Sequence, residues 1–365
     1  MKMKQFFFAA LAVLALSAGF TSCSDDDDNN NNPSSGDTKD KVAFILNEGA
    51  MSKNNASITG LYWADNTLFG GECVYKTQNQ QAVGDVGQDL VKDGDNMFLI
   101  VWGSAYIAKL DKTGKELVRA DLSQGELASL GSPRYGVVEG NYLYVSCYGN
   151  CVAKFKKSDL SYVSKVTVGN RPERLIEEDG YIYCTSSTDE SYQADNRLAK
   201  IDIKEFKEAT FFTPMSNQDR IMEVDDRVFI QGYGDAFDYP WGEVNTTTGE
   251  FTKIGNASTW AENDDVIYTV NSVTDWDTYA TTNYFATYDV EKSKYTEGAY
   301  LKNAPAELAS TSVFAMEFNP YNDYLYVMTT DFTNNSKIYV FNEKLEYVSM
   351  FESTGVNSKK IVFFN

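Results

Sequence analysis

One hydrophobic pattern recurs along most of the chain. In each copy, a turn rich in Asp, Asn or Gly precedes or borders a run of β-forming residues with an aromatic residue near its centre. Aromatic and β-branched residues favour strands, and turn residues bound them, so each copy predicts a β-strand. The central aromatic residues of the seven copies are Phe44, Phe98, Tyr144, Tyr183, Phe229, Tyr268 and Tyr326.

The spacing of the copies indicates the architecture. The mean separation of the central aromatic residues is (326 − 44)/6 = 47 residues, and a repeat of about 40–50 residues is typical of propeller blades. Alternating segments that end in Lys, Asp or Gly turns follow the copies, and shorter strand-like segments such as Tyr135–Val138 precede them. We therefore predict an all-β, seven-bladed β-propeller.

The end of the sequence predicts how the ring closes. The first copy begins at Val42 without a strand of its own before it, whereas Lys359–Phe364 has the pattern of an innermost strand. A C-terminal strand that joins the first blade covers two sheet edges that would otherwise stay open. We expect this strand to complete the first blade.

The first 40 residues differ in composition from the rest. Lys2 and Lys4 precede an apolar run from Phe6 to Phe20, which is typical of a secretory signal and too short to span a bilayer comfortably. The acidic and Asn-rich stretch that follows is too polar to form a core. We predict a signal peptide over 1–22, a disordered tether over 23–40 and a propeller over 41–365.

Charge and histidine content restrict the chemistry. The chain carries 32 Lys and Arg against 52 Asp and Glu, a formal net charge of −20, which argues against nucleic acid and anionic lipid as partners. It contains no histidine, which excludes Ser-His-Asp and Cys-His catalysis and His-containing zinc or haem sites. No carboxylate pair is singled out for glycoside hydrolysis. We predict a binding protein with no catalytic residues, no metal and no cofactor.

Two cysteines flank a predicted hairpin tip. Cys147 and Cys151 enclose Tyr148-Gly149-Asn150, and a small disulfide there suits an oxidising compartment. Two free thiols are the alternative, and the sequence leaves both open.

The loops expected at one end of the channel are rich in aromatic residues. In a propeller, the loops between second and third strands and the loops entering each innermost strand open on the same face. Flat rings with nearby amides suit a large amphipathic ligand, whereas packing between blades is the alternative role for any single ring. The candidate ligand residues of this kind are Asn54, Trp102, Tyr135, Tyr148, Tyr192, Tyr233, Phe237, Trp241, Trp260 and Trp276.

Cations are expected at the same end. Counting back nine residues from the central aromatics of the fourth and fifth copies reaches Arg174 (183 − 9) and Arg220 (229 − 9), and Arg134 lies one position out of register. Either Lys359 or Lys360 occupies a similar place in the closing strand. Such a cluster suits a phosphate or carboxylate of a ligand. Ion pairs with neighbours such as Glu173 are the alternative.

Six segments carry a resemblance over the whole predicted propeller: Phe44–Gly49, Asn54–Ile58, Gly84–Asp89, Pro133–Tyr135, Tyr144–Gly149 and Val168–Glu173. In these segments the chain resembles the YncE-like seven-bladed propellers, and more narrowly the surface lipoproteins that include the BtuG cobalamin-binding proteins. The context of Cys23 resembles a bacterial lipobox, which implies acylation of that cysteine. The acidic run after it resembles the surface-export signal of Bacteroides-type lipoproteins.

The resemblance implies a function. We expect a lipoprotein held at the outer membrane by its lipid anchor only and facing the cell exterior. It would capture a scarce nutrient, best a corrinoid such as cobalamin, and pass it to a TonB-dependent outer-membrane transporter. The loops at 186–197, 232–241 and 271–284 depart from the family pattern. Alternatives are a ferric siderophore as the ligand, or a propeller glycoside hydrolase or lyase.

Overall fold

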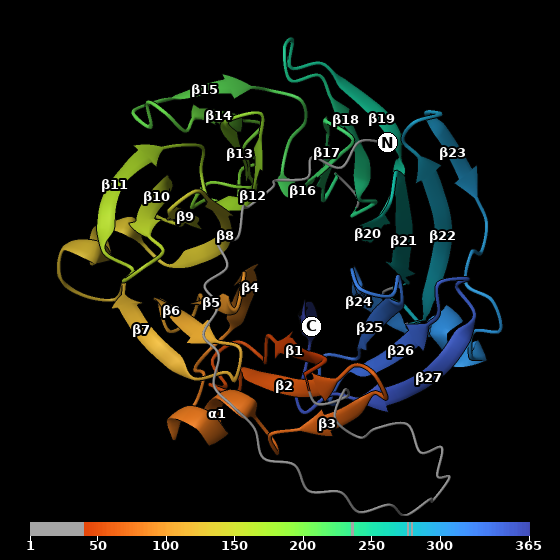
Figure 1. The fold of residues 1–365 in the computed structure, drawn as a ribbon. Coiled ribbons are helices and arrows are strands. Elements are labelled where there is room, and N and C mark those ends of the chain that lie inside the picture. The colour runs from red at the N-terminus through yellow and green to blue at the C-terminus, as the bar shows by residue number, and fades with distance from the viewer. Residues whose placement is uncertain (1–39, 235–236, 276, 279) are drawn as a thin grey trace, which may run out of the picture. The chain divides into compact units, whose positions relative to one another are not determined.

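The computed structural model describes residues 40–234, 237–275, 277–278 and 280–365. The predicted signal peptide, the tether with Cys23, and Trp276 lie outside these residues. The described residues form seven four-stranded antiparallel sheets arranged as a ring around a central channel (Figure 1). The seven-bladed β-propeller is therefore confirmed.

Each blade runs from an innermost strand beside the channel to an outermost strand at the edge of the ring. Blade 1 consists of β28 (Ser358–Phe364), β1 (Val42–Asn47), β2 (Ser57–Tyr62) and β3 (Thr67–Phe69). Blade 2 consists of β4 (Gly87–Asp93), β5 (Asn96–Val101), β6 (Tyr106–Asp111) and β7 (Glu116–Asp121). Blade 3 consists of β8 (Pro133–Glu139), β9 (Tyr142–Cys147), β10 (Cys151–Lys156) and β11 (Tyr162–Thr167). Blade 4 consists of β12 (Pro172–Glu178), β13 (Tyr181–Ser186), β14 (Leu198–Asp202) and β15 (Ala209–Phe212).

The remaining three blades follow the same order. Blade 5 consists of β16 (Gln218–Val224), β17 (Arg227–Gly232), β18 (Pro240–Val244) and β19 (Phe251–Asn256). Blade 6 consists of β20 (Thr259–Asn263), β21 (Val266–Thr274), β22 (Thr281–Asp289) and β23 (Lys294–Glu297). Blade 7 consists of β24 (Ser312–Phe318), β25 (Leu325–Thr330), β26 (Lys337–Phe341) and β27 (Tyr347–Glu352). Three short helical turns lie in connections: α1 (Val74–Asn79), η1 (Gly125–Leu130) and η2 (Ala306–Ser310). Among the described residues, no helix has the length and apolarity needed to cross a membrane.

The predicted repeat and closure both hold. All seven central aromatic residues lie in or directly beside the second strand of their blades, and rings such as Phe44 and Phe98 are fully buried. Strand β28 pairs with β1 antiparallel, with Val362 opposite Phe44. The C-terminal strand therefore completes blade 1, as its pattern predicts.

The innermost strands carry a recurrent irregularity. Six of them have a register shift at their N-terminal end, namely β4, β8, β12, β16, β24 and β28. Only β20 keeps regular pairing with its neighbour over Thr259–Asn263. A β-bulge re-aims side chains, and here each bulge lies at the same end of the channel. The residues that the shifts leave unpaired are Gln88, Arg134, Tyr135, Glu173, Arg174, Asp219, Phe314 and Lys359.

Blades 5 and 6 are separated by large aromatic rings. The rings of Trp241, Trp260 and Tyr288 pack between these blades, with centroids of Trp241 and Trp260 5.7 Å apart and nearly perpendicular. The innermost strands β16 and β20 consequently lie further apart than the other neighbouring pairs of innermost strands. This wedge widens the channel on one side.

Candidate functional site: the cationic mouth of the channel

The channel contains two connecting cavities. A cavity of about 510 Å³ is lined by blades 3 to 7 and by Lys359 and Lys360 of blade 1, and one of about 460 Å³ is lined by blades 1 to 5 and blade 7. Both are lined by Arg174, Glu317 and Lys360, so they form one continuous space. We call the end of this space at the N-terminal ends of the innermost strands the cationic mouth.

One ring of seven residues surrounds the channel at the cationic mouth. Each lies on an innermost strand, at the level of the second-strand residue two positions after the central aromatic. Asp89, for example, lies opposite Ile100, two residues after Phe98, and Arg220 lies opposite Gln231, two residues after Phe229. All seven line the two cavities. This polar ring consists, in blade order, of Lys360, Asp89, Tyr135, Arg174, Arg220, Thr259 and Ala315.

The next level of the channel is apolar. These residues lie directly opposite the central aromatics, as Met222 lies opposite Phe229. Six are hydrophobic, and the exception in blade 7 is Glu317. The apolar ring consists of Val362, Val91, Val137, Ile176, Met222 and Ala261. A ligand at the mouth would therefore meet charge first and hydrocarbon below it.

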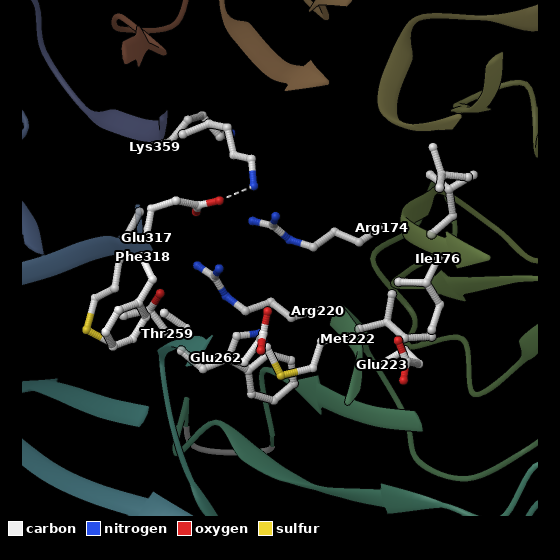
Figure 2. A pocket seen from close by; sticks show the side chains of 18 of the residues that line it. Arg174, Ile176, Arg220, Met222, Glu223, Thr259, Glu262, Glu317, Phe318 and Lys359 are labelled. Carbon is white, nitrogen blue, oxygen red and sulfur yellow. Dashed lines mark hydrogen bonds and ion pairs between the residues drawn. The ribbon is translucent and has the colours of Figure 1, made fainter. Parts of the chain in front are cut away.

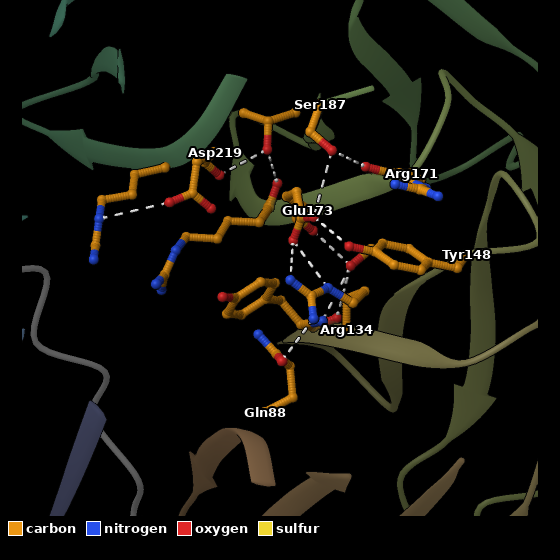
Figure 3. Close-up of polar contacts among 12 residues, drawn as sticks. Gln88, Arg134, Tyr148, Arg171, Glu173, Ser187 and Asp219 are labelled. Carbon is orange, nitrogen blue, oxygen red and sulfur yellow. Dashed lines mark hydrogen bonds and ion pairs between the residues drawn. The ribbon is translucent and has the colours of Figure 1, made fainter. Parts of the chain in front are cut away.

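Arg134 is held in a dense network of contacts, which Figure 3 shows. Its guanidinium donates to the Glu173 carboxylate at 2.6 Å and to the Gln88 side-chain oxygen at 2.7 Å. The Tyr148 hydroxyl donates to the same carboxylate at 2.6 Å. The guanidinium also lies 4.8 Å from the Tyr148 ring centre and 5.6 Å from that of Trp102. For Arg134, the ion-pair alternative therefore describes the structure.

Other cations of the mouth also have carboxylate partners. Lys359 pairs with Glu48 at 2.7 Å, and Lys360 pairs with Glu317 at 2.5 Å. Arg220 has only a loose partner, because its Nε lies 3.8 Å from Asp219.

Arg174 differs from these cations. Among the described residues, no carboxylate lies within 4.0 Å of its guanidinium, which instead lies 4.4 Å from the Tyr135 ring centre. The ring face orients the guanidinium by cation–π attraction. It does not provide an acceptor for the N–H groups that point outward in the plane of the guanidinium.

Two hydroxyl groups fix the bulges from behind. The buried Ser146 Oγ accepts from the Tyr135 N–H at 3.1 Å and donates to the Glu173 carbonyl at 2.6 Å. The buried Thr185 Oγ1 lies 3.1 Å from the Arg174 carbonyl and 3.0 Å from the Asp219 carbonyl. Each hydroxyl thus ties the bulge of its own blade to the bulge of the next blade. This ties the mouth residues to rigid second strands.

Two predicted aromatic residues are exposed on loops at the same end of the propeller. Tyr192 is 75% exposed and Phe237 is 63% exposed. The Arg171 guanidinium lies 4.7 Å from the Tyr192 ring centre, and Tyr233 meets Phe237 edge-on at 6.4 Å. Both rings sit on loops between second and third strands, and their exposure leaves them open to a ligand.

Two predicted ligand residues, Asn54 and Trp241, do not line the channel cavities, whereas Trp260 does. Asn54 lines a separate cavity beside Cys73, and its backbone N–H donates to Asp85 at 3.3 Å. The placement of Trp241 in an exposed loop is wrong, because it lies in β18 with no exposed surface. Trp260 lies in β20, is 7% exposed, packs against Trp241 and also lines the 510 Å³ cavity of the channel. For Trp241 and Trp260, packing between blades is the role that their burial supports.

Three members of the polar ring, Asp89, Thr259 and Ala315, are absent from the residues that the sequence predicts. Asp89 and Thr259 obey the count of nine before a central aromatic (98 − 9 and 268 − 9) that identifies Arg174 and Arg220. The sequence prediction used the count of nine only to find cations, and therefore missed Asp89 and Thr259, although the same count reaches both. The Asp89 carboxylate accepts from the backbone N–H groups of Leu90 at 2.9 Å and Gly136 at 3.1 Å.

Acidic residues gather at the opposite end of the innermost strands. Carboxylate oxygens of Glu178, Glu223 and Asp226 lie within 4.8 Å of one another. Burial, and then repulsion from Glu223 and Asp226, raises the pKa of Glu178 to about 7. The two ends of the channel therefore differ, with cations paired to carboxylates at the mouth and clustered carboxylates at the opposite end.

The predicted hairpin tip is present. Cys147 and Cys151 lie opposite each other across β9 and β10. Both are buried and both thiols are free in the structure. Tyr148 of the Arg134 network lies between them in the hairpin.

Known proteins share the fold at low sequence identity. A Bacteroides fragilis protein described as a proposed 6-phosphogluconolactonase matches with a TM-score of 0.61 and 11% identity, over 92% of this chain and 100% of its own. Kuenenia stuttgartiensis hydrazine synthase matches with a TM-score of 0.59 and 12% identity, over 75% of this chain and 88% of its own. The chain is a seven-bladed β-propeller. No protein-family model and no curated protein matches its sequence, so the propeller fold is what these comparisons show.

Proposed function

We propose that this propeller is a surface-exposed lipoprotein that captures a large amphipathic nutrient at the cationic mouth and passes it to a TonB-dependent outer-membrane transporter. The observation that carries the proposal is the convergence of exposed rings and guanidinium groups on one end of an open channel. Tyr192 and Phe237 are exposed on loops at that end of the propeller, and Arg174 and Arg220 line the channel. Sites of this composition, largely preformed and with few polar groups, suit ligand binding.

A corrinoid such as cobalamin is the ligand class that the proposal favours. Its flat macrocycle, amide arms and single phosphate match rings, hydrogen-bonding groups and cations, respectively. The chain has no histidine to replace an axial cobalt ligand, so recognition would depend on shape and hydrogen bonds. The resemblance to YncE-like propellers and BtuG lipoproteins supports this ligand and the lipid anchor at Cys23.

The direct test is calorimetric titration of the mature protein with cobalamin, with a ferric siderophore as the parallel ligand. We expect cobalamin to bind and the Tyr192→Ala and Phe237→Ala variants to bind it roughly 10-fold more weakly each, because exposed aromatic anchors contribute on the order of 1 kcal/mol or more. Neither ring is buried, so neither variant should unfold.

Phe211→Ala is the matched control. Phe211 is also an exposed ring, but it lies on the outermost strand of blade 4, away from the channel. Unchanged cobalamin affinity is expected for this variant. No heat with cobalamin would overturn the corrinoid assignment, and heat with the siderophore alone would assign the site to that ligand.

A further inference from the structure

Three neighbouring blades leave hydrogen-bonding atoms of the polar ring without partners. Among the described residues, Arg174 Nε, Arg220 Nε and Thr259 Oγ1 are buried and make no hydrogen bond. They come from blades 4, 5 and 6, on the side of the channel that the Trp241 wedge widens. Figure 2 shows both arginine side chains extending into the open centre of the channel, with Thr259 below them. We call these three residues the arginine-pair site.

Unpartnered groups of this kind are costly in a folded protein. A buried donor without an acceptor loses the full free energy of its hydration, and two guanidinium groups close together repel each other. Burial, and then the positive charge of Arg174, lowers the pKa of Arg220. The site therefore has an excess of hydrogen-bond donors in the free protein.

The surrounding carboxylates do not remove this excess. Asp89 accepts from two backbone N–H groups, and Glu317 is paired with Lys360. Asp219 stays 3.8 Å from Arg220 Nε. An oxyanion inside the channel would supply the missing acceptors and would offset the repulsion between the two guanidinium groups.

We propose that the arginine-pair site binds a phosphate-type oxyanion, and that it holds the phosphodiester of the captured corrinoid. The choice of corrinoid rests on the proposed function above, whereas the preference for an oxyanion rests on the donors themselves. A phosphodiester has two non-bridging oxygens, which share its negative charge and diverge tetrahedrally from phosphorus, so each can accept from a different guanidinium group while one also accepts from the Thr259 hydroxyl. A carboxylate has two oxygens in one plane and matches a single guanidinium better.

The first experiment uses inorganic phosphate as the probe. We expect phosphate to raise the thermal unfolding temperature of the wild-type protein at constant ionic strength, because a ligand that binds only the folded state stabilises it. The Arg174→Gln variant should lose this response. Without phosphate, circular dichroism and a cooperative melting curve should show that Arg174→Gln is folded, so that the lost response reports the site and not the fold.

The second experiment separates the phosphate from the rest of the corrinoid. Cobalamin contains the phosphate, and cobinamide lacks the phosphate and its nucleotide. We expect Arg174→Gln and Arg220→Gln to weaken cobalamin binding roughly 10- to 100-fold, the loss typical of a charge-assisted hydrogen bond, and to leave cobinamide binding unchanged. Arg174→Lys should recover only part of the affinity, because an ammonium group lacks the planar fork. The control Lys207→Gln removes an exposed positive charge that pairs with Glu205 on the surface.

The outcomes separate this proposal from the proposed function. If cobalamin binds equally to wild type and Arg174→Gln and phosphate has no effect, the arginine-pair site is overturned while nutrient capture stands. If cobalamin fails to bind but phosphate stabilises wild type and not Arg174→Gln, the oxyanion site stands and the corrinoid is wrong. Equal stabilisation by acetate would overturn the preference for phosphate.

Discussion

The two ends of strand β12 carry the same kind of residue in opposite environments. Glu173, at the cationic mouth, is 5% exposed and accepts hydrogen bonds from Arg134 and Tyr148. Glu178, at the other end, faces Glu223 and Asp226, and its pKa rises to about 7. One carboxylate is buried with partners, and the other is crowded by like charges.

The backbone accounts for much of this difference. Glu173 lies in a bulge, which takes its side chain out of the regular alternation and brings it to Arg134 of the preceding blade. Glu178 pairs regularly with Tyr181 beside a tight turn, and its neighbours are Glu223 and Asp226 at the same end of the next blade. Two carboxylates on one strand therefore differ because of the backbone. The bulge brings Glu173 to a specific partner, whereas regular pairing leaves Glu178 among like charges.

The largest expected effect comes from Glu173→Gln. It leaves the Arg134 guanidinium buried without its counter-charge, so we expect the free energy of unfolding to fall by about 3 kcal/mol, the low end for breaking a buried ion pair. Urea unfolding at pH 7 measures it. Glu205→Gln, in an exposed pair with Lys207, should change stability by less than about 0.5 kcal/mol. Equal effects of the two substitutions would show that the mouth network contributes nothing specific.

A smaller loss is expected for Thr185→Val. This substitution keeps the shape of the side chain but removes the hydroxyl that contacts the Arg174 and Asp219 carbonyls. We expect about 1–2 kcal/mol of destabilisation in the same urea assay, together with weaker ligand binding because the bulges lose their support. The exposed Thr167→Val is the control, since its side chain faces solvent. Unchanged stability in Thr185→Val would mean that the bulges hold their shape without the hydroxyl.

The smallest effect, and one of opposite sign, is expected for Glu178→Gln. An acid whose pKa is raised on folding contributes stability below its unfolded pKa of 4.5 and loses it as the pH rises through about 7. At pH 8 the ionised Glu178 is therefore unfavourable, and Glu178→Gln should melt roughly 1–3 °C above wild type. The difference should shrink at pH 5.5. A melting temperature below that of wild type at pH 8 contradicts the comparison between the two ends.

Most of the fold was predictable from local patterns. The seven central aromatics mark second strands because each is bounded by turn chemistry and flanked by β-forming residues. Closure by β28 followed from an unpaired first strand and an unpaired last one. The bulges were not predictable, because no residue type in Pro133–Tyr135 or Pro172–Arg174 indicates that strand pairing shifts there.

The candidate site was predictable only in part. The count of nine locates Arg174 and Arg220 because a tight turn joins their strands to the next, as at Val224 and Arg227. In blade 7 the turn is longer, so the same count reaches Glu317, directly opposite Tyr326 and one level deeper. Trp241 shows the other limit: Tyr239-Pro240-Trp241 carries two aromatics, and only the start of β18 at Pro240 decides which ring is buried.

Closure of the ring by β28 has a consequence for how the protein matures. Lys359 and Lys360 come from β28, which follows every other strand in chain order and pairs with the first. Contacts between such distant segments form late because they must overcome a large loop-closure entropy. A nascent chain therefore passes through an open ring whose β1 edge is free to pair with other chains, and its charged mouth is assembled only at the final docking step. Ligand binding would thus report that synthesis and closure are both finished.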